Sequence, residues 1–269
     1  MPEIHGAKIA IGGKGGVGKT TVSAILAQLF AEAQYDVLAI DADPDVNLAS
    51  AFGLPEEQSP EPLIKMKTLI AERTGTTRDT LGAYFKLNPK VSDLPEEYWI
   101  EIRNLKLLVL GAITQAGGGC ACPEGAFLKA LLTHTILLRE EVVMVALAAG
   151  VEFMGRASVQ GIDALVLVIE PGARSIETAN NMAKMATKLG IGCVGVVANK
   201  IVETSQIDAI RSQLGDAVLL GTLKYSRSLQ EADLERKPVF EADANVTDEL
   251  RRTMGQLEEL IAQAKRNDN

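Results

Sequence analysis

A glycine-rich run near the start of the chain has the residue types and the spacing of a phosphate-binding loop. Residues 13–20 read GKGGVGKT and match the pattern G-x-x-x-x-G-K-[ST]. Glycines let successive backbone N–H groups turn toward one phosphate chain, and a helix that follows adds the partial positive charge of its N-terminus. In such a loop the lysine, here Lys19, reaches the β- and γ-phosphates, and the hydroxyl of Thr20 binds Mg²⁺. We therefore expect ATP or ADP to bind with Mg²⁺ at Gly13, Lys14, Gly15, Gly16, Val17, Gly18, Lys19, Thr20 and Thr21.

A cluster of carboxylates follows the second apolar run of the chain. Residues 40–48 read IDADPDVNL and contain Asp41, Asp43 and Asp45. A carboxylate beside Mg²⁺ and a terminal phosphate can accept the proton of an attacking water and hold that water in line. The alternative is a structural turn, because Asp-Pro favours Asx-type turns. The lysine-containing phosphate loop makes the catalytic interpretation the preferred one.

A pair of cysteines lies in a second glycine-rich run. Cys120 and Cys122 follow Gly117-Gly-Gly and precede a proline. Two thiolates one residue apart can turn toward one soft metal ion, but they leave a tetrahedral site half filled. Two copies meeting at a dimer axis would complete a four-thiolate site, which suits Zn²⁺ or, in square-planar form, Ni²⁺. The alternative is a pair of small core cysteines, although the adjacent glycines favour a loop.

Apolar, β-rich runs alternate with helical patterns along the chain, which is typical of parallel βαβ units. The expected strands are 7–12, 36–41, 106–111, 141–147, 163–170, 193–198 and 217–222, and the expected helices are 18–33, 125–139, 174–189, 203–214 and 226–235. This predicts an α/β fold of the P-loop NTPase type, with a mostly parallel central sheet flanked by helices on both faces. Ligands of such sheets bind beyond the carboxyl ends of the strands. The phosphate loop and three segments that follow strands should therefore gather at one edge, namely 41–45, 111–122 and 148–152.

Residues 54–104 interrupt this alternation. They contain five of the ten prolines and the aromatic residues Tyr84, Tyr98 and Trp99, which either pack on the core or form a docking surface for a partner. We predict one domain over residues 1–269, with an insertion of helices and loops at about 54–104. The final segment, 246–265, has one apolar helical face and mixed charges on the other, which predicts packing on the core and not attachment to a membrane.

The charge balance argues against two classes of partner. The chain has 27 Lys and Arg against 35 Asp and Glu, a net charge of −8 and a pI near 5.0. This argues against broad electrostatic binding to nucleic acid or to an anionic membrane and leaves a local basic patch as the alternative. No stretch approaches a membrane span, no signal-peptide pattern is present, and three cysteines in 269 residues fit a reducing compartment. We expect a cytoplasmic protein that binds neither nucleic acid nor a membrane.

The second lysine of the phosphate loop carries a family resemblance. With Lys14 the run reads KGGVGKT, which resembles the deviant phosphate-binding loop of the ATPases related to MinD, ParA and the nitrogenase iron protein. In that group the extra lysine crosses a dimer interface to the partner's nucleotide. The resemblance therefore implies a homodimer closed by ATP, with Lys14 and Lys19 in catalysis. Residues 40–48 resemble switch I of the same ATPases, which implies that Asp43 orients or activates the attacking water and that Asp41 lies near Mg²⁺.

Further segments resemble the CooC family, ATPases that help to mature the nickel–iron carbon monoxide dehydrogenase and whose relatives serve acetyl-CoA synthase. They are GGGCACPE at 117–124, AGVEFMGR at 149–156 and EPGARSIETA at 170–179. The resemblance implies an ATP-dependent dimer that binds Ni²⁺ or Zn²⁺ through Cys120 and Cys122 and assists nickel insertion into one of these client enzymes. It also implies that Asn199 contacts adenine.

Two related classes compete with this interpretation. A reductase like the nitrogenase iron protein would have a second cluster cysteine where this chain has Phe153. A MinD/ParA-type positioning ATPase would need a basic membrane helix or a DNA-binding patch, and neither is evident.

One position departs from the family pattern. The pattern Asp-x-Glu-Ala-Gly is expected after the fourth strand, where residues 146–150 read ALAAG. In the family pattern the aspartate orders water around Mg²⁺, and an alanine does not. Ala146 therefore predicts slow ATP hydrolysis, while nucleotide binding is retained. The prediction of an ATPase therefore has an alternative, a non-hydrolysing metallochaperone that is gated by nucleotide.

Overall fold

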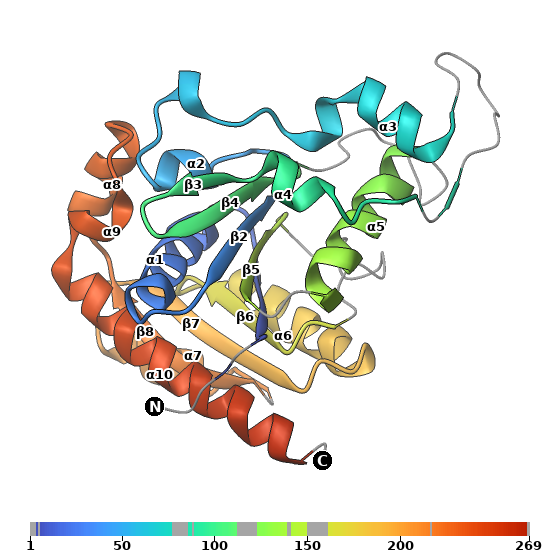
Figure 1. The fold of residues 1–269 in the computed structure, drawn as a ribbon. Helices are drawn as coiled ribbons and strands as arrows, with labels where there is room; N and C mark the ends of the chain where they lie inside the picture. The colour runs from blue at the N-terminus through green and yellow to red at the C-terminus, as the bar shows by residue number, and fades with distance from the viewer. Residues whose placement is uncertain are drawn as a thin grey trace.

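The computed structural model describes residues 4, 6–76, 86, 87, 89–111, 123–138, 141–149, 161–215 and 217–267. Eight strands of this part form one sheet in the order β3-β4-β2-β5-β1-β6-β7-β8 (Figure 1). All neighbours pair in parallel except β3 and β4, which are antiparallel. The strands are β1 (Lys8–Gly13), β2 (Val37–Ala42), β3 (Ile100–Ile102), β4 (Leu105–Val109), β5 (Val142–Leu147), β6 (Ala164–Ile169), β7 (Cys193–Ile201) and β8 (Val218–Lys224).

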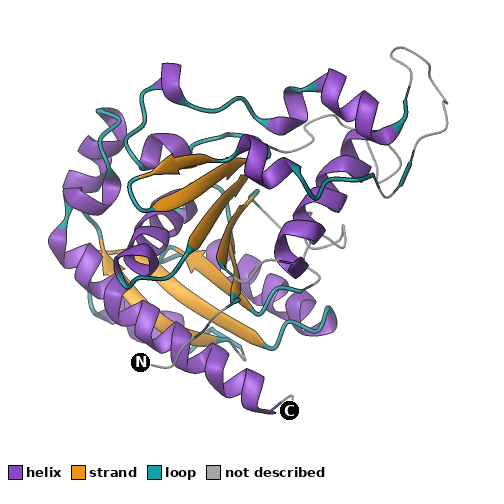
Figure 2. Ribbon diagram, viewed as in Figure 1, coloured by secondary structure: helices purple, strands orange, loops and turns teal. Residues whose placement is uncertain are grey.

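Helices cover both faces of the sheet, as Figure 2 shows. Strand residues alternate between two cores: Ile9 and Ile11 of β1 belong to one, and Ala10 between them belongs to the other. The first core includes side chains of α1 and α10, and the second includes side chains of α5 and α6. The helices are α1 (Lys19–Glu32), α2 (Leu48–Ala51), α3 (Lys67–Thr74), α4 (Leu94–Tyr98), α5 (Pro123–Leu138), α6 (Ala173–Lys188), α7 (Ser205–Arg211), α8 (Arg227–Leu234), α9 (Val239–Ala242) and α10 (Ala244–Asn267). The predicted α/β fold is therefore confirmed.

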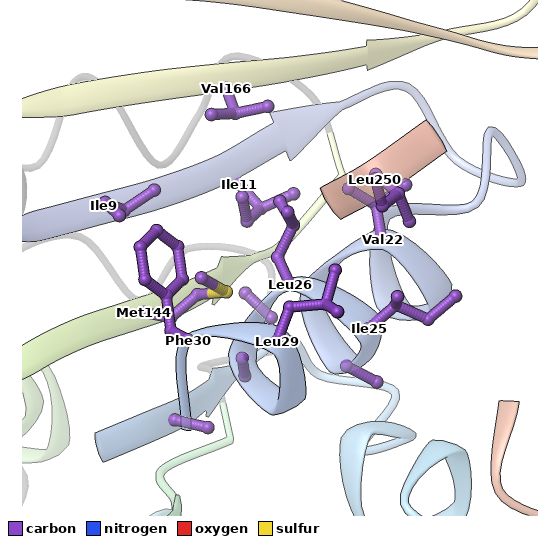
Figure 3. Close-up of a cluster of buried hydrophobic side chains, with 14 of the residues drawn as sticks. Ile9, Ile11, Val22, Ile25, Leu26, Leu29, Phe30, Met144, Val166 and Leu250 are labelled. Carbon is purple, nitrogen blue, oxygen red and sulfur yellow. The ribbon is translucent and has the colours of Figure 1, made fainter. Parts of the chain in front are cut away.

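Helix α1 anchors the phosphate loop. All of residues 22–31 are buried. Figure 3 shows side chains of α1 in one cluster with Ile9 and Ile11 of β1, with Met144 and Val166 of the neighbouring strands, and with Leu250 of α10. Each large apolar side chain in such a cluster contributes roughly 1.5–3 kcal/mol through burial. The loop thus connects a central strand to a helix that the core holds in place.

The predicted strands correspond to β1, β2 and β4–β8, and the predicted helices correspond to α1, α5, α6, α7, α8 and α10. The sequence pattern missed β3, a three-residue strand that forms a hairpin with β4 through Arg103, whose φ is 54°. It also missed the four-residue helices α2 and α9. Segments this short do not show a hydrophobic period, so only their tertiary pairing reveals them.

The segment 54–104 was expected to contain helices and loops, and β3 corrects that expectation. The segment also has 3₁₀ turns at Glu56–Gln58 and Leu63–Lys65. Tyr98 and Trp99 pack against the second core, and the ammonium of Lys106 lies 4.8 Å from the centre of the Trp99 ring. These contacts support packing as the role of both residues, while Tyr84 lies outside the described residues. The single-domain boundary stays a prediction.

The C-terminal helix packs as predicted. Leu250, Leu257 and Ile261 of α10 are buried in the first core. None of the helices that the structure describes is long and apolar enough to cross a bilayer.

Candidate nucleotide-binding site

The phosphate loop leaves the carboxyl end of β1, which lies between β5 and β6 in the sheet. Two glycines permit its course. Gly13 has a φ of 143°, and a Cβ at this position would overlap the carbonyl oxygen of Val168 on β6. Gly18 has a φ of 97° and is the N-cap of α1, where no side chain caps the helix. The first N–H groups of α1 are thus placed to bind an anionic ligand.

A cavity of 460 Å³ opens at this edge of the sheet. Its size is within the range of about 300–1,000 Å³ for small-molecule sites. The predicted site residues that line it are Gly15, Gly16, Gly18, Lys19, Thr20, Thr21, Asp43 and Asn199. Four predicted site residues do not line the cavity: Lys14, which is exposed, and Gly13, Val17 and Asp41, which are buried. The cavity therefore brings together the phosphate loop after β1 and Asp43 after β2, as expected, with Asn199 from the end of β7. Of the other two segments expected at this edge, Ala149 lines the cavity, and 112–122 and 150–152 lie outside the described residues.

Lys19 is the buried lysine of the loop. The residue is 8% exposed, and its Nζ donates to the carbonyl oxygen of Lys14 at 3.4 Å. Burial lowers the pKa of the Lys19 ammonium, and the nearby carboxylate of Asp43 opposes this shift. A charge with so little water around it interacts more strongly with a phosphate than an exposed charge does.

Asp41 organises the segment that carries Asp43. One oxygen of its carboxylate accepts the N–H of Asp43 at 3.1 Å, and the other accepts the N–H groups of Asn47 at 3.1 Å and Leu48 at 2.8 Å. Burial raises the pKa of Asp43, and the charge of Lys19 lowers it in part. A carboxylate with a raised pKa is a better proton acceptor for an attacking water. Asp41 thus acts on the backbone of 43–48, and its predicted proximity to Mg²⁺ stays a prediction.

The variant Asp41→Asn is expected to remove a pH dependence of stability. Burial raises the pKa of Asp41 from 3.8 to about 6. Between these values the folded wild type binds more protons than the unfolded chain, so its unfolding free energy falls as the pH rises. The asparagine does not titrate, so the unfolding free energy of the variant minus that of the wild type should increase by about 2 kcal/mol from pH 4 to 6 and level off above about pH 7. Urea unfolding of both proteins across this range measures the difference, and a constant difference would contradict the assignment.

One residue that contacts the loop was not predicted from the sequence. Lys200 follows Asn199 at the end of β7, lines the cavity and donates from its Nζ to the carbonyl oxygen of Gly16 at 2.5 Å. Asn199 donates from its Nδ2 to the carbonyl oxygen of Val17 at 2.9 Å. The signal was present, because Lys200 is a charged residue at the carboxyl end of a predicted strand. The contact of Asn199 with adenine stays a prediction.

Comparison with known proteins agrees with this geometry. Residues 8–239 match the family model of the CobQ/CobB/MinD/ParA nucleotide binding domain. The chain belongs to this family. It is 42% identical to the carbon monoxide dehydrogenase accessory protein CooC of Rhodospirillum rubrum over 228 residues. The aligned residues cover 84% of this chain and 86% of that protein. An uncharacterized ATP-binding protein of Methanocaldococcus jannaschii is 43% identical over 235 residues, 86% of this chain and 90% of that one.

Solved structures show the same fold at low identity. MinD of Pyrococcus horikoshii in complex with Mg-ADP has a TM-score of 0.66 and 16% identity, with 96% of this chain and 98% of that chain covered. The resemblance to the CooC and MinD/ParA ATPases is therefore confirmed. The chain is a nucleotide-binding protein of the P-loop ATPase family.

Ala146 is the residue that stands where an aspartate was expected from the family resemblance. It lies in β5, is 5% exposed and pairs in register with Asp41 of β2 on one side and Ile11 of β1 on the other. An alanine here offers no carboxylate to order water, and Asp41 is the acidic residue in the paired strand. Ala146, from which slow hydrolysis is predicted, therefore lies beside Asp41, in the segment 40–48 that resembles switch I.

The predicted metal ligands Cys120 and Cys122 lie outside the described residues, as does Phe153. The described residues contain no group of three or more His, Cys, Asp or Glu that could hold a metal ion. Cys193 is 1% exposed in β7, and its Sγ lies 3.5 Å from the carbonyl oxygen of Leu260. This third cysteine therefore packs in the first core.

Proposed function

We propose that this protein is an ATP-dependent, dimeric maturation factor that binds a metal ion through Cys120 and Cys122 and assists nickel insertion into carbon monoxide dehydrogenase or acetyl-CoA synthase. The observation that carries this proposal is the 42% identity to a carbon monoxide dehydrogenase accessory protein over 84% of the chain. The work takes place in the cytoplasm, and the whole chain acts as one domain.

The cavity supports the proposed binding and hydrolysis of ATP. Lys19 lines the cavity, where its ammonium would bind the β- and γ-phosphates. Thr20 also lines the cavity, and its hydroxyl would be a ligand for Mg²⁺. Mg²⁺ keeps several waters and takes its remaining ligands from phosphates, so it needs no cluster of carboxylates. Asp43, which lines the same cavity, receives the proton of the attacking water.

Lys14 accounts for the dimer. Its side chain is exposed beside the cavity and does not line it. An exposed lysine at this point can reach a nucleotide bound by a second copy. ATP thus closes two subunits face to face and brings their cysteine pairs to the axis, where the metal cargo is held until the nucleotide is released.

The metal half is tested by counting Ni²⁺ or Zn²⁺ bound per dimer. Wild type with ATP should bind about one ion per dimer, since two cysteine pairs complete one four-thiolate site. The double variant Cys120→Ser/Cys122→Ser should bind none, because a serine hydroxyl is a poor ligand for these ions. Cys193→Ala removes the buried third cysteine and is the matched control. Undiminished metal binding by the double variant would exclude the proposed site.

A non-hydrolysing, nucleotide-gated metallochaperone is the second candidate. The alanine at position 146, buried next to Asp41, favours it. In that case ATP binding alone would close the dimer, and exchange of nucleotide would open it. A phosphate-release measurement separates the two candidates, with Lys19→Ala as the baseline.

A further inference from the structure

We propose that Lys200 is a positioning residue that, together with Asn199, aims two N–H groups of the phosphate loop at the bound nucleotide. The inference rests on nucleotide binding and is independent of the metal and of the client enzyme. Its basis is a pair of adjacent side chains at the end of β7 that hold adjacent carbonyl groups of the loop.

The two contacts join segments that are far apart in the chain. The Nζ of Lys200 donates to the carbonyl oxygen of Gly16 at 2.5 Å across 184 residues, and the Nδ2 of Asn199 donates to the carbonyl oxygen of Val17 at 2.9 Å across 182 residues. The Asn199 side chain is itself fixed, because its Oδ1 accepts the N–H of Lys200 at 2.8 Å. Asn199 is 8% exposed, so its contact is protected from water.

Because the peptide bond is planar, a contact that fixes a carbonyl group also fixes the direction of the N–H group of the next residue. In a trans peptide the C=O and the following N–H point in opposite directions. When Lys200 holds the carbonyl of Gly16, it therefore also orients the N–H of Val17. When Asn199 holds the carbonyl of Val17, it orients the N–H of Gly18. Both N–H groups belong to the glycine-rich run that should surround the phosphates.

The loop needs such external support. Gly16 and Gly18 have φ values of 80° and 97°. Glycines have many accessible backbone states, so a loop with several of them loses more entropy on ordering than other sequences do. Donors that hold the carbonyls before the ligand arrives reduce this cost, which is the physical meaning of preorganisation.

The backbone at Lys200 indicates that this side chain is placed at a cost. Lys200 has a φ of 58°, the left-handed region that residues with a Cβ rarely adopt. The register between β7 and β8 is irregular at this point, between Ala198 and Ile201. A non-glycine residue persists in this conformation when its surroundings over-determine it, and such residues gather at functional sites.

Glu170 directs the ammonium of Lys200. Its Oε2 lies 3.4 Å from the Nζ, and the backbone N–H of Glu170 donates to the hydroxyl of Ser175 at 3.1 Å. Glu170 follows β6, so the ion pair connects the ends of two neighbouring strands with the loop that follows β1. The ammonium contacts the Glu170 carboxylate and the Gly16 carbonyl oxygen together, so the ion pair restrains it beside the loop.

The test is calorimetric titration of MgADP, pyrophosphate and adenosine into wild type, Lys200→Gly and Lys200→Arg. We expect Lys200→Gly to weaken binding of MgADP and pyrophosphate by about 10-fold and to leave that of adenosine unchanged, because only the phosphate contacts lose orientation. Its unfolding temperature without ligand should stay within about 2 °C of wild type, because glycine relieves the left-handed backbone. Lys200→Arg retains a donor and should recover most of the affinity.

Two more variants separate orientation of the loop from loss of charge and from misfolding. Lys224→Ala removes another lysine of the cavity, one that makes no hydrogen bond to the fully described loop 13–21, and we expect a loss of less than about threefold. Lys200→Met keeps the side-chain length and removes the donor; it should weaken MgADP binding by about the same factor, and it replaces the glycine variant if that variant fails to fold. Unchanged MgADP affinity in Lys200→Gly and Lys200→Met, an equal loss for adenosine, or an equal loss in Lys224→Ala would overturn the inference. A wild type that binds no MgADP would overturn nucleotide binding itself as well.

Discussion

Lys19→Ala is expected to weaken MgATP binding by up to about 100-fold and to abolish phosphate release. Lys19 is 8% exposed, and burial lowers its pKa, so its ammonium lies in surroundings where a phosphate is its best partner. A charge-assisted hydrogen bond of this kind contributes up to about 3 kcal/mol, which corresponds to roughly 100-fold in affinity. Alanine also leaves Asp43 without the positive charge that lowers its pKa. Calorimetry measures the affinity, and a phosphate-release assay measures turnover.

Lys14→Ala is the matched control in the same loop. Lys14 is exposed, so its removal should retain nucleotide binding to a single subunit and prevent dimer formation with ATP. Light scattering during gel filtration measures the dimer. If Lys19→Ala bound MgATP as tightly as wild type, the assignment of this lysine would fail. If wild type bound MgATP but released phosphate no faster than Lys19→Ala, the non-hydrolysing chaperone would replace the ATPase, and Ala146 would supply the reason.

Gly13→Ala is expected to lower the unfolding free energy by roughly 3–4 kcal/mol. Two effects combine at this position. The φ of 143° is strained for any residue with a Cβ, and the new methyl group would overlap the backbone carbonyl oxygen of Val168. A backbone atom in a paired central strand cannot rotate away as a side chain can. The strain would therefore separate β1 from β6 at the point where the phosphate loop begins.

Gly172→Ala is the matched control for this prediction. Gly172 is the N-cap of α6 with an extended φ of −174°, and a Cβ there has no atom within 4 Å among the described residues. Its replacement should change the unfolding free energy by less than about 1 kcal/mol. Urea unfolding of the two variants gives the comparison. Equal stability of Gly13→Ala and wild type would show that β1 and β6 can separate without cost, contrary to their close packing.

The hydrophobic pattern of the sequence was sufficient to predict the fold class and most of its strands and helices. Seven of the eight strands and six helices of seven residues or more were predicted, because segments of this length can carry a readable hydrophobic period. Helix α3, with eight residues, was expected only as one of the helices without bounds in 54–104. Strand β3 and helices α2 and α9 were missed because three or four residues do not. The order of the strands also had no local signal, since it depends on which apolar faces pack together.

The sequence by itself determined the chemistry of the phosphate loop, because a match of eight consecutive residues specifies backbone conformation, anion binding and a helix start together. It also placed Lys19, Thr20 and Asp43 at one edge, since strand ends in a parallel sheet share an edge. Only the tertiary structure decided which groups these side chains contact. The carboxylate of Asp41 accepts backbone N–H groups, and Lys200 holds a carbonyl of the loop from 184 residues away. The reason is physical: burial and hydrogen-bond partners depend on distant segments meeting, and residue types at local spacing carry no record of that meeting.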